Sequence, residues 1–156
     1  MKKHIRAVAS TTIRKPVEEV FQAFANPQYS VMVDPATVSA VLIGGEPFSK
    51  GAEYEVTIKA PFFLMKNIKE KQVYTEYDPP HRLTIDVSQD SMSGPENEIF
   101  DVAEDGAVTV KWIANYELRG MMAWLSKLIE RMAQSKGQIW IDNMKQTIEM
   151  GRKPPE

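Results

Sequence analysis

The sequence predicts an α+β domain in which an antiparallel sheet of about seven strands is combined with one long C-terminal helix. Apolar residues alternate with period two between residues 38 and 118, and short turns separate these runs. Residues 121–150 instead carry apolar residues at helical spacing. The length of 156 residues and the 43% apolar content fit one globular domain. We therefore expect a single domain over residues 1–151 and a disordered tail over residues 152–156.

The N-terminal part predicts one strand followed by two short helices. Residues 5–13 are rich in β-branched residues, which favour an edge strand. Pro16 suits the first turn of a helix, and Glu18 and Glu19 complement the positive end of its dipole. Asn26-Pro27 ends this helix. Residues 28–33 then predict a second short helix.

Six further strands are expected, joined by turns such as Gly44-Gly45, residues 78–81 and residues 104–106. The predicted strands are residues 38–43, 52–60, 66–77, 83–87, 96–102 and 108–118. In most of them one face is apolar and the other polar. This alternation with short turns predicts an antiparallel meander rather than parallel crossover units.

Two strands leave the choice of inward face open. Residues 66–77 can turn Ile68, Glu70, Gln72 and Tyr74 inward, or Lys69, Lys71 and Val73. Residues 96–102 can turn Glu96, Glu98 and Phe100 inward, or Asn97, Ile99 and Asp101. Either choice brings an ionisable group toward the helix, and a buried carboxylate has to pair, shift its pKa or meet a ligand.

The helix over residues 121–150 is expected to be unbroken and to end at Gly151. Its predicted inward stripe is Met122, Leu125, Ile129, Met132, Lys136, Trp140, Asn143 and Thr147. Gly137 costs about 1 kcal/mol relative to alanine in a helix interior. We therefore expect a bend or a close contact with the sheet at Gly137.

Composition disfavours several classes of function. The net charge of −2 provides no basic field for a phosphate backbone, so no nucleic-acid partner is expected. Cysteine is absent, and His4 and His81 have no neighbours at metal-ligand spacing, so we expect no metal and no cofactor. No apolar run reaches the roughly 20 residues that span a bilayer. We expect a cytoplasmic protein.

Three segments together carry a resemblance to a known family. They are residues 13–21 with Asn26-Pro27, the turn at residues 77–83, and residues 116–120 leading into a helix that ends with residues 143–149. In this order and spacing, the chain resembles the START-like or SRPBCC superfamily, also called birch-pollen-allergen-like, and its polyketide cyclase/dehydrase and lipid transport group.

The resemblance implies a helix-grip fold, in which the sheet curls around the long helix and leaves an internal cavity. It implies binding or transport of a small hydrophobic molecule or lipid. Two alternatives remain: an enzyme of the polyketide cyclase/dehydratase kind, and an interaction protein similar to the chaperone activators or ribosome-associated members.

Candidate cavity residues are those on the expected inner faces of the strands and helix. They are Tyr54, Val56, Ile58, Phe62, Phe63, Ile85, Glu98, Phe100, Trp112, Tyr116, Met122, Leu125, Ile129, Met132 and Trp140. Glu98, Tyr54 and Tyr116 are the candidate proton-transfer groups for a cyclase reaction. A solvated position near a strand end is the competing interpretation for Glu98.

Residues 60–65 place four large apolar residues beside Pro61, where a hairpin turn is expected. In relatives this connection gates the cavity, so Phe62–Met65 is a candidate gate or transient membrane contact. Packing of Phe62 and Phe63 as a satellite core, or a dimer contact, is equally compatible. The protein is expected to be a monomer or a homodimer.

Overall fold

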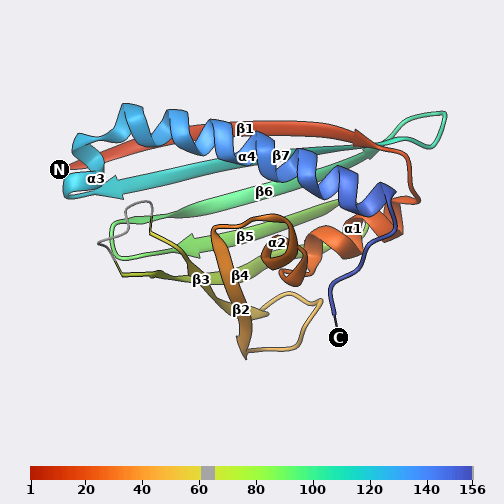
Figure 1. Cartoon of the computed structure of the whole chain (residues 1–156), viewed down its shortest axis with the longest axis horizontal. Coiled ribbons are helices and arrows are strands. Elements are labelled where there is room, and N and C mark those ends of the chain that lie inside the picture. The colour runs from red at the N-terminus through yellow and green to blue at the C-terminus, as the bar shows by residue number, and fades with distance from the viewer. Residues whose placement is uncertain (61–65, 156) are drawn as a thin grey trace.

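A seven-stranded antiparallel sheet forms the body of the protein, and its strand order is β1-β7-β6-β5-β4-β3-β2 (Figure 1). The computed structural model of the chain describes residues 1–60 and 66–155. The strands are β1 (Lys2–Ile13), β2 (Thr37–Gly44), β3 (Glu53–Ile58), β4 (Ile68–Asp78), β5 (Arg82–Ser88), β6 (Met92–Val102) and β7 (Val108–Arg119). From β2 to β7, strands that follow each other in the chain are paired, and β1 pairs with β7.

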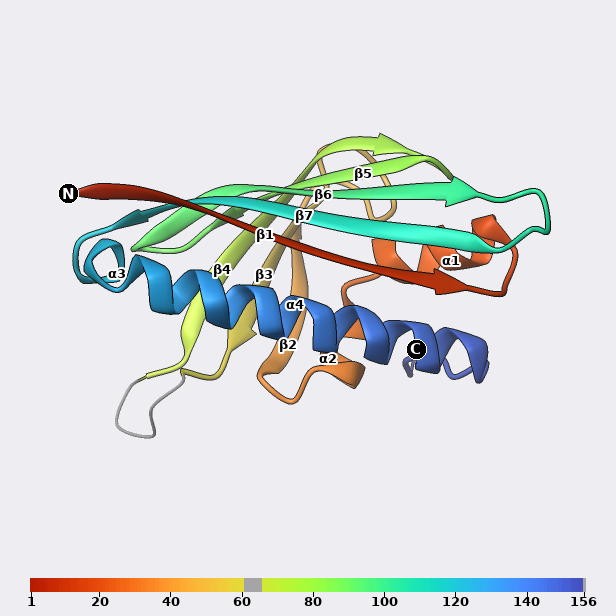
Figure 2. The same ribbon diagram turned by 90° about the horizontal axis from the view of Figure 1, so that it is seen from above.

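Within the described residues, four helices accompany the sheet, namely α1 (Val17–Ala25), α2 (Gln28–Val33), α3 (Met121–Trp124) and α4 (Ser126–Glu149). Figure 2 shows the curved sheet on one side and α4 running along its length on the other. The predicted α+β class and helix-grip arrangement are confirmed.

The predicted phases of the strands can now be assigned. Glu70 and Tyr74 on β4 are buried, and so are Glu98 and Phe100 on β6. The inward faces are therefore the ones that carry Glu70 and Glu98. Strand β6 begins at Met92, four residues before the predicted start, because the Gln89 N–H donates to the Met92 carbonyl and closes a tight turn.

The expectation of one unbroken helix over residues 121–150 is wrong. The helix is interrupted at Leu125, where φ is −96° and ψ is 20°. The Leu125 N–H is shared between the carbonyls of Met121 and Met122 at 3.3 and 3.1 Å, which tightens the last turn of α3. No glycine or proline marks this break in the sequence.

Helix α4 lies beside the edge strand β1 and satisfies its outward backbone groups. The Glu130 carboxylate accepts from the Arg6 N–H at 2.9 Å. The Gln134 amide accepts from the Val8 N–H at 2.9 Å and donates to the Val8 carbonyl. The Gln138 amide donates to the Ser10 carbonyl at 3.0 Å. These side chains take the place that a neighbouring strand would occupy.

The residue spacing along α4 matches the residue spacing along β1. Four residues of helix advance about 6 Å, and two residues of strand advance about 6.6 Å. Glu130, Gln134 and Gln138 are four residues apart on α4, and their partners on β1 are two residues apart. The match keeps α4 aligned along the edge of the sheet.

This placement shifts the buried stripe of α4 relative to the prediction. Its most buried residues are Gly137, Ile141, Met144 and Ile148, whereas the predicted Trp140, Asn143 and Thr147 are half-buried. The stripe is displaced by one residue because α4 faces β1 as well as the concave sheet. Only one flank of α4 turns toward the inside of the sheet.

Gly137 makes the close contact with the sheet that the sequence predicts. A Cβ atom at this position would lie 2.4 Å from the Trp112 ring on β7. Only glycine allows this approach. At the far end, Gly151 has a φ of 70°, and the Gly151 and Arg152 N–H groups bond to the carbonyls of Ile148 and Thr147. These two bonds form a Schellman cap that ends the helix.

Replacing Gln134 with methionine is expected to destabilise the fold by about 1–2 kcal/mol, because both hydrogen bonds to Val8 are lost while the side-chain length is kept. Urea denaturation measures the free energy of unfolding. Gln146→Met on the exposed side of the same helix is the matched control. Equal stability of the two variants would contradict the edge-sealing role of Gln134.

Candidate functional site: an internal cavity with buried carboxyl groups

An aromatic cluster fills the end of the sheet next to α1. The rings of Phe21 and Phe24 lie 5.0 and 5.6 Å from the Phe100 ring. Phe24 also meets Trp140 edge-on at 5.6 Å, and Trp140 in turn lies 6.2 Å from Trp112. This end is a filled core, and Phe24, Trp112 and Trp140 form the boundary between it and the cavity beyond.

The cavity has a volume of about 330 Å³ and lies between the concave face of the sheet, the α1–α2 region and the inner flank of α4. Its walls are mostly apolar, with polar side chains gathered on β4 and β6. Ten of the sequence-predicted residues line it: Val56, Ile58, Ile85, Glu98, Trp112, Tyr116, Met122, Ile129, Met132 and Trp140.

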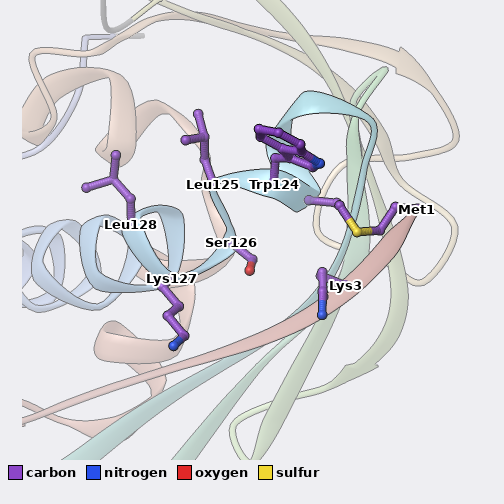
Figure 3. Close-up of a pocket in the computed structure, with 8 residues that line it drawn as sticks. Met1, Lys3, Trp124, Leu125, Ser126, Lys127 and Leu128 are labelled. Atoms are coloured by element: carbon purple, nitrogen blue, oxygen red, sulfur yellow. The ribbon is translucent and has the colours of Figure 1, made fainter.

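Three predicted cavity residues are placed elsewhere, and Phe62 and Phe63 lie outside the described residues. Tyr54 is buried against the ring of Tyr74, with the centroids 5.5 Å apart. Phe100 belongs to the aromatic cluster. Leu125 lines an open surface depression with Met1, Trp124 and Leu128 (Figure 3). The break before α4 turns Leu125 outward and leaves it 47% exposed.

Three glutamates bring carboxyl groups to the cavity wall. Glu70 on β4 lies opposite Val56 of β3. Glu96 lies between Ile85 and Ala114 of the neighbouring strands, and Glu98 between Leu83 and Trp112. Because residues two apart on a strand share a face, Glu96 and Glu98 project from β6 side by side. All three glutamates line the cavity.

The hydrogen bonds of these carboxyl groups differ. Gln72 donates to Glu70 at 2.8 Å, and Gln89 donates to its other oxygen. The Tyr116 hydroxyl donates to Oε1 of Glu96. Oε2 of Glu98 is buried and has no hydrogen-bond partner among the residues that the structure describes. Glu98 is therefore the least satisfied member of the group, and an unmet buried oxygen is costly.

Burial raises the pKa of each carboxyl. The pKa of Glu96 is raised to about 7 by burial and by the charge of Glu70, with partial opposition from the Tyr116 and Trp112 side chains. Burial, followed by the neighbouring Glu96, raises the pKa of Glu98 well above its ordinary value. Burial also raises the pKa of Glu70, against the hydrogen bonds from Gln72 and Gln89. Burial in the cavity therefore favours the protonated forms of these carboxyls.

The cavity has further lining residues outside the predicted set. They are Phe24, Pro27, Ser30, Asp34, Ala36, Thr37, Glu70, Gln72, Tyr74, Gln89, Met92, Glu96, Ala133, Lys136 and Gly137. Glu70 and Gln72 share one face of β4 with the buried Tyr74, and Glu96 shares one face of β6 with the buried Phe100. These two aromatic residues could have indicated the correct strand phases. The α1–α2 contributions depend on tertiary packing and have no local signal.

Across residues 1–60 and 66–155, no group of three or more histidine, aspartate or glutamate side chains is arranged to hold a metal ion. Among the helices of that same part of the chain, none combines the length and the apolar character that a bilayer crossing demands.

A curved antiparallel sheet and a long C-terminal helix, with a cavity between them, define the helix-grip fold. The family model described as polyketide cyclase / dehydrase and lipid transport matches residues 4–149. The chain belongs to this family, as its resemblance to the START-like superfamily implies. Among curated proteins, none matches the chain significantly.

Solved structures show the same fold at low sequence identity. A conserved protein from Geobacillus kaustophilus is 14% identical, with a TM-score of 0.79 over 96% of this chain and 98% of the other. Ara h 8.0201 is 13% identical, with a TM-score of 0.71 over 94% and 98% of the two chains. The di-domain protein StfQ of the steffimycin biosynthetic pathway is 9% identical, with a TM-score of 0.74, and the match covers 95% of this chain and 52% of StfQ.

Glu96 is expected to make folding stability fall as pH rises. A carboxyl whose pKa is raised on folding keeps its proton where the unfolded chain releases it. Its contribution is therefore complete below about pH 4.5 and is lost as pH rises through about 7. A shift of this size corresponds to roughly 3 kcal/mol, so Glu96→Gln is expected to recover much of the loss at alkaline pH.

Urea denaturation at about pH 5 and about pH 8 measures this effect as a difference between the two free energies of unfolding. The amide introduced by Glu96→Gln retains an oxygen that can accept from Tyr116, which keeps the variant close to the native packing. Glu104→Gln, at an exposed turn, is the control for removing one surface carboxyl. An identical pH response in wild type and Glu96→Gln would contradict the raised pKa of Glu96.

Proposed function

We propose that this protein binds a small hydrophobic molecule in the cavity between the sheet and α4. The supporting observation is the cavity itself, because the same sheet is filled by aromatic rings at its α1 end and left open beyond Phe24, Trp112 and Trp140. Its volume of about 330 Å³ lies at the lower end of the range of about 300–1,000 Å³ found for ligand pockets.

The chemistry of the walls supports a ligand that is mostly apolar with one polar group. Ile58, Ile85, Ile129 and Met132 offer apolar contact, and methionine adapts readily to different shapes. The carboxyls of β6 provide the few polar groups that orient a ligand in such a pocket. The family description includes lipid transport, which agrees with carriage of a hydrophobic molecule.

A second candidate function is acid–base catalysis on a bound molecule, as in a cyclase or dehydratase. The observation that favours it is Glu96, whose pKa of about 7 and hydrogen bond from Tyr116 suit proton transfer at neutral pH. StfQ, which shares the fold, is described as an aromatase/cyclase. Identifying a retained compound before and after incubation with fresh protein separates the two functions. Binding alone leaves the compound unchanged, whereas catalysis converts it.

Filling the cavity tests the binding function. Ala133 on α4 lines the cavity and is half-buried, so Ala133→Phe places a ring in the ligand volume. The fluorescence of N-phenylnaphthylamine, an uncharged hydrophobic probe, is expected to rise on binding to the wild-type protein. The substitution is expected to weaken this binding at least about tenfold, because the ring removes ligand contact area.

Ser135→Phe adds the same ring two residues away on the exposed side of α4 and is the matched control. Circular dichroism checks that each variant is folded. A wild-type protein that leaves the probe unbound would contradict the proposed function. So would equal affinity of Ala133→Phe and Ser135→Phe for the probe.

A further inference from the structure

The charged groups around the cavity are strongly biased toward acids. Lys136 is the one basic side chain among the described residues that line it, and it is solvent-exposed. Four carboxyl groups line the same cavity, namely Asp34, Glu70, Glu96 and Glu98. Tyr74 and Tyr116 are the remaining titratable groups of this lining.

Some of these groups already form hydrogen bonds within the protein. Asp34 accepts from the Ala36 N–H and the Thr37 hydroxyl at 2.9 Å each, which fixes the turn after α2. The Tyr74 hydroxyl donates to the Ala25 carbonyl at 2.8 Å. Glu70 is held through both oxygens by Gln72 and Gln89. The acceptor positions that remain are therefore on Glu96 and Glu98.

Besides the excess of acidic groups, the environment of Glu98 indicates a missing partner. Its side chain is 2% exposed, and its Oε2 is without a hydrogen-bond donor among the described residues. A buried carboxyl oxygen in this state lacks the compensation that folded proteins normally provide. The cavity wall has acceptors in excess, so the complementary ligand is one that brings donors.

Building on the proposed binding function, we propose that the ligand is a small hydrophobic molecule with an ammonium group, which donates to Glu98 and Glu96 at the polar wall of the cavity. An ammonium group provides several donors for two adjacent carboxyls, and charge-assisted hydrogen bonds of this kind are among the strongest in proteins. A hydroxyl brings one donor and no charge. A carboxylate or phosphate brings acceptors to a wall that already has acceptors in excess, and it adds a buried negative charge, which opposes its burial.

Ammonium binding couples to proton release. Burial raises the pKa values of Glu96 and Glu98 because it disfavours their charged forms. A cation beside them favours the ionised carboxylates. The affinity for an amine is therefore expected to rise between about pH 5 and about pH 8 as the cost of releasing protons falls. Lys136, Asp34 and Glu70 surround the same cavity, so variants are needed to assign the effect.

Octylamine, octanol and octanoate form a matched series that tests the proposal by isothermal titration calorimetry. The wild-type protein is expected to bind octylamine at least about tenfold more tightly than octanol, the effect of one charge-assisted hydrogen bond. Octanoate is expected to bind most weakly. Glu98→Gln is expected to lose most of the preference for the amine while its affinity for octanol stays within about twofold.

Glu96→Gln provides the second variant, and Glu104→Gln is expected to retain the wild-type preference. The rise of octylamine affinity with pH needs no variant and is measured on the wild-type protein. Octanol or octanoate binding as tightly as octylamine would overturn the ammonium assignment and leave the binding function intact. Failure of all three compounds to bind would overturn the ammonium assignment, and the N-phenylnaphthylamine measurement then tests the binding function separately. An unchanged amine preference in both glutamate variants would remove these residues from the site.

Discussion

The hydrogen bonds between α4 and the edge strand β1 are the constraint on which the site depends. Glu130, Gln134 and Gln138 hold the helix along β1, where the spacing of four helical residues matches that of two strand residues. A helix tied to the edge cannot settle fully into the concave sheet. Gly137 allows close approach at Trp112, and the space left beside that contact is the cavity.

The cavity combines two opposing requirements. The walls are mostly apolar, and burial among them raises the free-energy cost of the charged forms of Glu96 and Glu98. The fold tolerates these residues by keeping their protons, with Tyr116 donating to Glu96. Glu98 retains an unmet acceptor. A core designed only for stability would have placed apolar residues at both positions.

The sequence predicts the fold well because its apolar residues recur at regular strand and helix spacings. Alternation in residues 52–60 and 108–118 identifies the inward faces, and Gly137 and Gly151 have the contact and the cap that their positions indicate. The break at Leu125 has no local signal, and it displaces Leu125 from the cavity to the surface. Placing Tyr54 and Phe100 in the core, and Asp34 at the cavity, requires the packing of α1 and α2, which no periodicity specifies.

Carbon-13 NMR titration of the glutamate side-chain carboxyls in the free protein tests the central claim most directly. That claim is that burial in the cavity raises the pKa values of Glu96 and Glu98. The account predicts that Glu96 titrates at about 7 and that Glu98 remains protonated well above the usual range of a glutamate. Titration of both carboxyls near their ordinary value of about 4.3 would contradict it.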